Sequence, residues 1–389
     1  MAPAQKYSTT KNPHVLHIAS GDLWAGAEVM LYTLVKSLHT DLEIKITVVL
    51  LNPGALEEKL RECGITVQII DESQFNGLQI FQQLNNIIKQ TLPDVIHTHR
   101  IKENILGGIA AWRNGIPSIR TTHGAPEHRP PLYKIPKHLI LLTDRLLGRY
   151  CQQNIVAVSP DLAEILKRKF PESKVLTITN GIGIESLRRN MPPHSANNNG
   201  HHHIGIAGRL SPIKRVDLFI EMASYLKQHN PELSIQFHIY GDGPLNDSLQ
   251  IQAHSQQADD YIHFEGHCEN ISQELQSLDA LVMTSDHEGL PMVLLEAMCL
   301  QTPIIASAVG GIPDLLEQGK CGTLVRKHTA KAFSEAVINL ITKPKQHQQL
   351  ALMALERVRN HYSAKHTAET YLSVYQSLLT HKNSEKKLK

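Results

Sequence analysis

The chain has 389 residues, which is enough for two or three domains that each bury a core. Its composition, with 41% hydrophobic and 20% charged residues, is ordinary for a globular protein and excludes disordered and fibrous classes. The formal net charge of +2 and the lack of a basic block interleaved with aromatic residues give no reason to expect a nucleic-acid partner.

The cysteines and the apolar runs bear on the cellular compartment. The 5 cysteines are scattered, odd in number and never spaced as CxxC, which favours a reducing compartment over a disulfide framework. The first residues lack the apolar core of a signal peptide, and no run approaches the roughly 18 apolar residues that span a bilayer. We therefore expect a cytoplasmic protein and leave peripheral contact with the membrane face open.

Strand-length apolar segments alternate with amphipathic segments of helical length from Val15 onward. This alternation predicts an α/β fold with a doubly wound parallel sheet. The predicted strands of the first half occupy residues 14–19, 43–51, 66–70, 94–99, 117–122, 154–159 and 174–179.

The alternation stops at residues 190–203, which are rich in Pro, Asn and Gly and which we interpret as an interdomain linker. It then restarts, so the sequence predicts two Rossmann-like domains that face each other across a cleft. We expect an N-terminal domain over 1–195, a C-terminal domain over 196–360, and a final helix over 361–389 that returns to the N-terminal domain and ends in a polar tail. The predicted strands of the second half occupy residues 204–208, 234–241, 261–267, 280–285, 302–307 and 322–325.

Two glutamates in the segment TSDHEGLPMVLLEAMCLQTPIIAS carry the first functional signal. Glu288 lies in the loop after a predicted strand, and Glu296 lies in the following helix, for which Pro291 suits the first turn. Ligands of parallel α/β sheets bind at this loop edge, and a helix N-terminus suits phosphate. Eight helical residues would turn Glu296 only about 80° from Glu288, so both could face one ligand. On their own, the two acids would more often be a solvated loop residue and a helix-surface residue.

Two cations occupy the loop after the first strand of the second half. The planar guanidinium of Arg209 can form two parallel hydrogen bonds, and the ammonium of Lys214 is a compact positive charge, a combination that suits a diphosphate. Two solvated cations without a ligand explain the pattern about equally well. In the first half, Gly21 and Gly26 frame a loop before a helix, but the Lys and the Ser or Thr of a P-loop are missing. No GxGxxG motif occurs, which removes the main support for a dinucleotide oxidoreductase.

Histidines give three further candidates. His97 and His99 have the HxH spacing of some metal sites, but no carboxylate or cysteine evidently completes a set, so we expect no metal. The histidines at 201–203 open a strand after the linker, where solvated side chains are the simpler interpretation. His123 follows a strand end and precedes Gly124, where backbone can approach a ligand, although a lone histidine there is more often structural.

Together these motifs resemble those of a family 4 (group 1) glycosyltransferase of GT-B architecture, from about Val15 to the C-terminal helices. The strongest match is EGLPMVLLEAM, in which seven residues separate Glu288 from Glu296. The segment GRLSPIK resembles the family's diphosphate clamp, WAGAE its N-terminal glycine loop, and TTHG its active-site histidine.

The resemblance implies that the N-terminal domain binds the acceptor and that the C-terminal domain binds the sugar nucleotide. It also implies a role for each motif. Glu288 and His123 would bind the donor sugar, and Glu296 would bind the ribose hydroxyls of the nucleotide. Arg209 and Lys214 would hold the diphosphate, and the second glycine of the N-terminal loop would offer a backbone N–H near the phosphate and the acceptor. By this resemblance the catalytic residues are His123, Glu288, Arg209 and Lys214, and the donor-binding residues are Gly26, Arg209, Lys214, Glu288, Gly289, Leu290 and Glu296.

Three positions depart from the family pattern and bear on which donor fits. Gly183 stands where the family often has Asp, and Pro291 stands where it often has Gly. Arg215 replaces the Gly that often follows the clamp lysine.

The resemblance also implies an activity. It is a retaining, metal-independent transfer of a hexosyl unit, without a cofactor, from a nucleotide-diphosphate sugar to a glycan or lipid-linked acceptor, in cell-surface polysaccharide or lipopolysaccharide synthesis. A UDP-sugar is favoured over a GDP-sugar as the donor. Since no residue is an evident covalent nucleophile, the leaving phosphate would act as the base for same-face attack. The open alternatives are a GT-B phosphorylase or sugar-nucleotide epimerase, a non-catalytic sugar-nucleotide-binding protein, and a metal hydrolase that uses His97 and His99.

Residues 131–150 combine an apolar stripe at helical spacing with basic side chains. Such a stripe usually belongs to a helix packed on its own sheet, which is the interpretation we favour. The alternative is a helix or loop lying on an anionic membrane, which would bring a lipid-linked acceptor to the cleft. The apolar residues are Leu139, Ile140, Leu142, Leu146 and Leu147, and the basic ones are Lys134, Lys137, Arg145 and Arg149.

Overall fold

The computed structural model describes residues 12–21, 24, 26–124, 135–189, 200–268 and 270–387. Most of the expected linker, as well as Lys134, lies outside these residues. The chain forms two compact units: unit 1 comprises Met1–Gly181 and Ala364–Lys389, and unit 2 comprises Ile182–Ser363.

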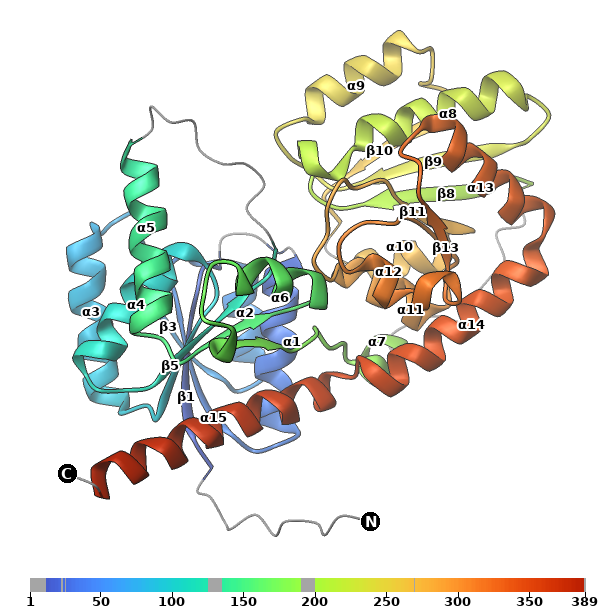
Figure 1. Ribbon diagram of the computed structural model, residues 1–389. Coiled ribbons are helices and arrows are strands. Elements are labelled where there is room, and N and C mark those ends of the chain that lie inside the picture. Colours follow the sequence, from blue (N-terminus) through green and yellow to red (C-terminus); the bar gives the residue numbers. More distant parts are fainter. Residues whose placement is uncertain are drawn as a thin grey trace, which may run out of the picture. The chain divides into compact units, whose positions relative to one another are not determined.

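Unit 1 contains a seven-stranded sheet in the order β3-β2-β1-β4-β5-β6-β7 (Figure 1). Every neighbouring pair runs parallel, and in the β1–β4 pair His17 lies opposite His97. Each strand falls within a segment that the sequence predicted, which confirms a doubly wound sheet. The strands are β1 (His14–Ala19), β2 (Lys45–Leu50), β3 (Thr66–Ile69), β4 (Val95–Thr98), β5 (Ser118–Thr122), β6 (Asn154–Ala157) and β7 (Val175–Thr177).

Helices cover both faces of this first sheet. They are α1 (Gly26–Thr40), α2 (Ala55–Glu62), α3 (Gly77–Thr91), α4 (Ile101–Arg113), α5 (Ile135–Tyr150), α6 (Pro160–Lys167), the short η1 (Glu172–Lys174) and α15 (Ala364–Lys387). On one face α1, α2 and the C-terminal α15 share a core with Val15 and Ala19 of β1. On the other face α3 and α4 cover Leu16 and Ile18. Alternate residues of β1 therefore serve opposite cores, as expected for a parallel strand buried on both sides.

Helix α5 overturns one expectation from the sequence. Leu139, Ile140, Leu142 and Leu146 are exposed, so the apolar stripe does not pack on the sheet, and only Leu147 of the five is half-buried. The expectation was wrong because helical periodicity identifies an apolar face without identifying what covers it. Across the described part of the chain, no helix combines the length and the apolarity that crossing a membrane requires.

Unit 2 contains a six-stranded parallel sheet in the order β10-β9-β8-β11-β12-β13. These strands also coincide with predicted segments, which confirms a second Rossmann-like sheet. They are β8 (His202–Ala207), β9 (Ile235–Tyr240), β10 (Ile262–Gly266), β11 (Ala280–Met283), β12 (Ile304–Ser307) and β13 (Thr323–Val325).

The helices of unit 2 again lie on both faces of the sheet. They are α7 (Ile184–Arg189), η2 (Pro212–Lys214), α8 (Val216–His229), α9 (Asn246–Ser255), α10 (Ile271–Ser277), α11 (Met292–Leu300), α12 (Ile312–Leu315), η3 (Glu317–Gly319), α13 (Ala330–Thr342) and α14 (Pro344–His361). One core joins α8, α9 and α13 to the strands, while α11 packs against α10 and α14. Unit 2 begins at Ile182, earlier than the boundary expected after residue 195, because α7 already packs against α11.

Candidate functional site

The carboxyl edge of the second sheet brings two functional loops together. Strands β8 and β11 are neighbours, so the loop that carries Arg209 and Lys214 lies beside the loop that carries Glu288. Thr284 Oγ1 links the loops, because it donates to the Lys214 carbonyl at 3.1 Å and to the Arg215 carbonyl at 2.8 Å. The backbone of the cationic loop is therefore held by the strand end that precedes the acid.

Lys214 and Glu288 form an ion pair at this edge. Lys214 Nζ lies 2.6 Å from Glu288 Oε1, and the side chains are 25% and 10% exposed. Ser285 Oγ donates to the same carboxylate oxygen at 2.6 Å. A carboxylate has further lone pairs, so Glu288 can still accept a hydrogen bond from a ligand hydroxyl while it holds the lysine.

Gly310, which the sequence analysis did not single out, supports the backbone of Glu288. Its φ is +53°, and a Cβ at this position would lie 1.9 Å from the Glu288 carbonyl oxygen. The next residue, Gly311, donates its N–H to that oxygen at 3.1 Å. Only glycine combines this left-handed conformation with so close an approach.

The loop that carries Arg209 and Lys214 ends at Arg215, whose backbone is left-handed and which departs from the family pattern. Arg215 has φ 50° and ψ 45°, a conformation in which Gly is the usual choice. Its guanidinium lies 3.0 Å from Asp217 and 3.3 Å from Asp286, so ion pairs hold the arginine in place. Arg209, on the same loop, is exposed and thus open to a ligand.

Glu296 lies on α11 and is buried. The helix begins at Met292 after Pro291, so Glu288 lies in the loop, and the expected rotation of about 80° between the two acids does not apply. Burial raises the pKa of Glu296 to about 7, and a hydrogen bond with Ser272 opposes the shift. Within the described residues its Oε2 is buried without a hydrogen-bond partner. A ligand hydroxyl would satisfy this oxygen and favour the ionised form.

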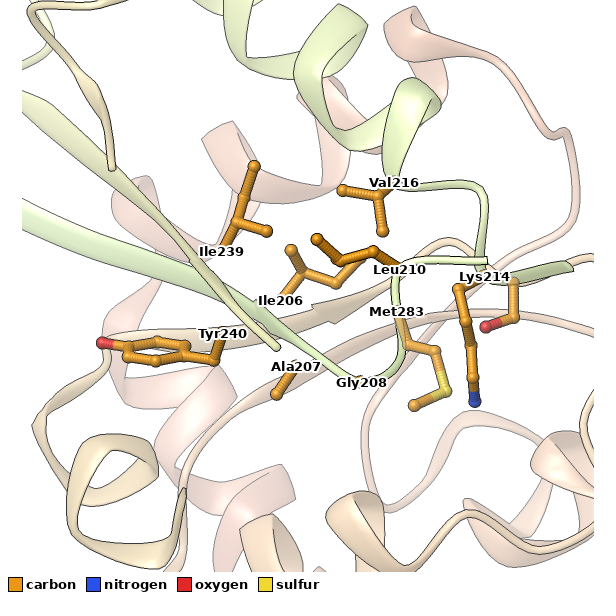
Figure 2. A pocket seen from close by; sticks show the side chains of 10 residues that line it. Ile206, Ala207, Gly208, Leu210, Lys214, Val216, Ile239, Tyr240 and Met283 are labelled. Carbon is orange, nitrogen blue, oxygen red and sulfur yellow. The ribbon is translucent and has the colours of Figure 1, made fainter. Parts of the chain in front are cut away.

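A pocket opens beside the same edge (Figure 2). Apolar side chains, among them Val216 and Met283, form most of its wall, and Lys214 and Ser285 add polar atoms. An apolar pocket beside a cation suits a ligand that joins a ring to an anionic group.

The glycines and the leucine predicted to bind the donor are placed as follows. Gly26 is the first residue of α1, is exposed, and a Cβ there would meet nothing within 4 Å. The free N–H groups of this helix start are therefore reachable by an anion. Gly289 and Leu290 are buried between Glu288 and α11.

His123 belongs to a second pocket, at the carboxyl edge of the first sheet. Ser20, Glu28, His99 and Arg100 also line this pocket, and Arg100 forms an ion pair with Glu28. Burial, together with the positive charge of Arg100, lowers the pKa of His123 to about 4. The imidazole is therefore neutral at pH 7 and can donate or accept one hydrogen bond at each nitrogen, according to its tautomer.

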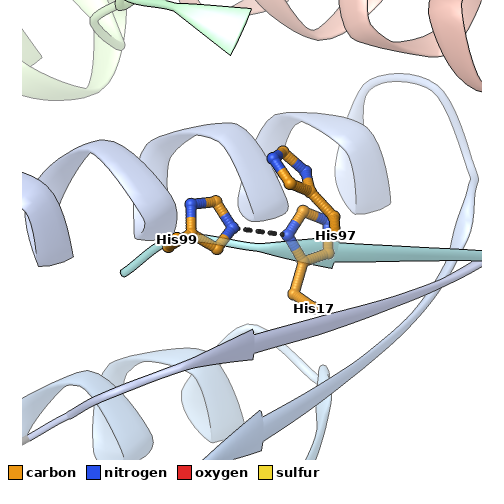
Figure 3. Close-up of side chains that lie close together, drawn as sticks. All are labelled: His17, His97 and His99. Carbon is orange, nitrogen blue, oxygen red and sulfur yellow. Dashed lines mark hydrogen bonds between the residues drawn. The ribbon is translucent and has the colours of Figure 1, made fainter. Parts of the chain in front are cut away.

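Three histidines gather in the core behind this pocket (Figure 3). One ring nitrogen from each of His17, His97 and His99 lies within 4.8 Å of the others. The sequence analysis missed His17 because only the parallel pairing of β1 with β4 brings it next to the HxH motif. Both ring nitrogens of His97 already contact hydroxyl groups, of Tyr375 and Thr121, at 2.8 Å. A metal ion on His97 would have to displace one of these hydroxyls.

The histidines at 201–203 differ from the expectation of solvated side chains. His203 is half-buried, and its Nδ1 lies 2.9 Å from His238 Nε2. His238 in turn contacts Glu265 at 2.8 Å. The expectation was wrong for His203 because the neighbouring strand β9 brings His238, two residues beyond Gln236, the residue paired with His203, against its ring.

The two parallel, Rossmann-like sheets are those of the GT-B architecture, which solved glycosyltransferase structures share. The family model described as Glycosyltransferase Family 4 matches residues 24–186, and the model described as Glycosyl transferases group 1 matches residues 201–343. The chain belongs to the family 4 (group 1) glycosyltransferases.

Individual proteins show the same likeness. The structure of HepE from Anabaena, in complex with UDP and glucose, superposes with a TM-score of 0.81 at 19% identity, covering 94% of this chain and 100% of that one. A UDP-Gal:α-D-GlcNAc-diphosphoundecaprenol α-1,3-galactosyltransferase from Escherichia coli is 24% identical over 298 residues, which are 73% of this chain and 76% of that enzyme. The poly(ribitol-phosphate) α-N-acetylglucosaminyltransferase of Staphylococcus aureus is 26% identical over 225 residues, 57% of this chain but only 43% of that enzyme.

Proposed function

We propose that this protein transfers a hexosyl unit from a nucleotide-diphosphate sugar, with a UDP-sugar favoured, to a glycan or lipid-linked acceptor with retention of the anomeric configuration. The observation that carries the proposal is the 2.6 Å pair of Lys214 and Glu288 on the loops of β8 and β11, followed by the buried Glu296. This edge offers a cation for the diphosphate and two acids for hydroxyl groups, as a sugar nucleotide requires.

The proposed mechanism is electrostatic. As the bond between the anomeric carbon and the phosphate oxygen breaks, its electron pair moves to the diphosphate, where Lys214 and Arg209 stabilise the charge. The ammonium of Lys214 has three N–H donors, so it can bind a phosphate oxygen while it keeps Glu288. The acceptor hydroxyl attacks the face that the diphosphate leaves, and its proton passes to the departing phosphate. The proposal uses no metal and no cofactor.

The names of two relatives support the acceptor class and a role in cell-surface polysaccharide or lipopolysaccharide synthesis. One relative acts on a diphosphoundecaprenol-linked sugar and the other on poly(ribitol-phosphate). A lipid-linked acceptor would be met at a membrane surface, with the protein on its cytoplasmic side.

Helix α5 supports a peripheral contact of this kind. Leu139, Leu142, Leu146 and Tyr150 recur at intervals of three and four residues, so they lie on one helix face, and all four are exposed. A face of this size is costly in water and suits the boundary between headgroups and acyl chains.

Basic residues complement this apolar face. Arg145 and Arg149 are exposed on the same helix, and each basic residue near an anionic bilayer is worth about 1 kcal/mol. The opposite side of α5 is anchored in unit 1, where Asp144 forms an ion pair with the buried Arg120 at 2.7 Å. The anchored helix thus presents its apolar face outward, and we propose that an anionic membrane covers it.

The function is tested by incubating the purified protein with a set of UDP- and GDP-sugars and measuring slow hydrolysis of the donor. We expect at least one UDP-sugar to be hydrolysed, without loss of rate in EDTA, and the released sugar to have the anomeric configuration of the donor by NMR. Glu288→Gln should abolish most of this rate, whereas Lys320→Ala, which removes an exposed lysine paired with Glu317, should not. No hydrolysis of any donor, or a rate that Glu288→Gln leaves unchanged, would contradict the proposal.

A further inference from the structure

A row of histidines crosses the carboxyl edge of the first sheet. His17 is on β1, His99 directly follows β4, and His123 directly follows β5, and these three strands are neighbours in the sheet. His17 Nδ1 lies 3.2 Å from His99 Nε2, the contact drawn in Figure 3, and His99 Nδ1 lies 3.4 Å from His123 Nε2. The ring centroids are 5.5 and 5.6 Å apart, with small interplanar angles of 16° and 25°.

All three rings are neutral at pH 7. Burial lowers the pKa of His17 to about 3, and burial with the Arg100 charge lowers that of His123 to about 4. Burial and the neighbouring histidines place the pKa of His99 well below its ordinary value. Each imidazole therefore carries one N–H and one lone pair.

Only two proton arrangements make both hydrogen bonds of the row. In the first, His17 Nδ1–H donates to His99, His99 Nδ1–H donates to His123 Nε2, and His123 keeps its proton on Nδ1. In the second, every proton is reversed, and the last one rests on His17 Nε2. The two end atoms, His123 Nδ1 and His17 Nε2, are both buried without a hydrogen-bond partner among the described residues.

The two ends of the row differ in their surroundings. His123 lines the second pocket, whereas His17 is not part of its wall and is fully buried. The second arrangement would bury an N–H donor permanently at His17, and orphaned buried donors are rarer than orphaned acceptors. The first arrangement leaves only a lone pair in the core and places the unpaired donor on His123, a residue that lines the pocket.

We propose that His17 and His99 are positioning residues that hold His123 as its Nδ1–H tautomer, so that it donates a hydrogen bond to a substrate oxygen in this pocket. His97 is not a member of the row, because its nitrogens contact the hydroxyls of Tyr375 and Thr121. The identity of the substrate oxygen rests on the proposed function, but the tautomer of His123 does not.

The direct test is the tautomer itself. The full-length protein is labelled with ¹⁵N in its histidine rings, the His123 signals are assigned by their loss in His123→Gln, and long-range ¹H–¹⁵N spectra are recorded without substrate. We expect Nδ1 of His123 to show a protonated-type shift and Nε2 a deprotonated-type shift. The opposite assignment in the wild-type protein would overturn the proposal.

Two variants test whether the row sets this tautomer. His99→Phe and His17→Leu should each convert His123 into a mixture of tautomers, and either variant suffices if the other does not fold. His97→Phe is the matched control, because it alters a buried histidine of the same cluster outside the row, and it should leave the His123 tautomer unchanged. An unchanged tautomer in the folded His99→Phe or His17→Leu protein would contradict the positioning role.

Kinetics separate this inference from the proposed function. Since one hydrogen bond contributes about 1 kcal/mol, His99→Phe should lower the rate of donor turnover roughly fivefold to tenfold. A protein with the expected His123 tautomer that turns over no sugar nucleotide would leave the inference standing and remove the proposed function. An active enzyme with the opposite His123 tautomer would leave the proposed function standing and overturn the inference.

Discussion

Lys214 Nζ lies 2.6 Å from Glu288 Oε1, so the cation proposed to hold the diphosphate also holds the acid proposed to bind the sugar. Neither side chain is free in solvent, because Glu288 is only 10% exposed and Lys214 25%. Removal of one partner leaves the other shielded from water and without its counter-charge. The two residues should therefore act as one element of the site.

The first prediction concerns the cations. Lys214→Ala and Arg209→Ala should each lower turnover by about 10²-fold or more, because they meet charge that develops in the transition state. The double variant Lys214→Ala with Glu288→Gln should lose less than the product of the two single losses, since the partners are in contact. Steady-state kinetics measure both effects, and Lys320→Ala is the control. Turnover within a few-fold of the wild-type value in both single variants would falsify the diphosphate role.

The second prediction separates the two acids. Glu296→Gln should chiefly weaken binding of the free nucleoside diphosphate, because the ribose loses a charged acceptor. Glu288→Gln should chiefly impair sugar transfer and spare that affinity. Titration calorimetry with UDP measures the difference, and equal losses of UDP affinity in both variants would rule out the assignment.

The third prediction follows from the buried state of Glu296. Its folded-state pKa is about 7 against an ordinary 4.5, so the unfolded chain ionises this group first as the pH rises. The free energy of unfolding should therefore decrease as the pH rises from about 4.5 to about 7. Above pH 7 the decrease is complete and amounts to about 3 kcal/mol. Glu296→Gln should therefore stabilise the ligand-free protein at pH 8 by up to this amount and change little at pH 4.5.

Urea unfolding of the wild type and of Glu296→Gln at both pH values measures this stability. The same logic predicts that UDP affinity of the wild type rises as the pH rises through about 7, because the ionised carboxylate is the better acceptor. If the stability difference between the two proteins is the same at pH 4.5 and pH 8, Glu296 does not titrate as the structure implies.

The fourth prediction concerns the exposed face of α5. Wild-type protein should sediment with anionic vesicles at low salt and be released at high salt, because the contact is partly electrostatic. Leu142→Ser with Leu146→Ser should abolish sedimentation, and Arg149→Glu, which changes an exposed basic residue on the same side of the helix as Leu142, should weaken it. Leu352→Ser on α14 is the matched control, since Leu352 and Leu142 are both 52% exposed.

Two outcomes would count against membrane contact by α5. If the wild-type protein stays in the supernatant at low salt, a soluble glycan or small-molecule acceptor becomes the better proposal. If the wild-type protein stays in the supernatant and is a dimer in solution that the leucine variant dissociates, the apolar face binds a second copy of the chain.

The fifth prediction concerns the anchor of α5. Arg120 on β5 is 2% exposed, and its guanidinium contacts both the carboxylate and the backbone carbonyl of Asp144, at 2.7 and 3.0 Å. Asp144→Ala would leave a buried cation without its counter-charge, which typically costs about 3–5 kcal/mol. Urea unfolding should show this loss, whereas Thr143→Ala, on the same helix, should change stability little. A loss below about 1 kcal/mol would show that the pair is not the anchor.

The sequence by itself determined the parts of this protein that depend on local pattern. Buried parallel strands are short apolar runs between helical segments, so every strand of both sheets was predictable. A loop that follows such a strand lies at the carboxyl edge wherever the strand sits in the sheet, which is why Arg209, Lys214 and Glu288 could be placed near a ligand. The spacing of Glu288 and Glu296 added the family resemblance.

Only the tertiary structure decided which distant residues meet and which surfaces stay uncovered. His17 joins His99, 82 residues away, because strand order sets the neighbours at a sheet edge and no local pattern encodes that order. The pKa of Glu296 depends on burial by surrounding elements, and the exposure of Leu142 depends on which side of α5 meets Arg120 and α4. Side-chain periodicity specifies an apolar face, but desolvation and pairing arise only when the rest of the fold packs against it.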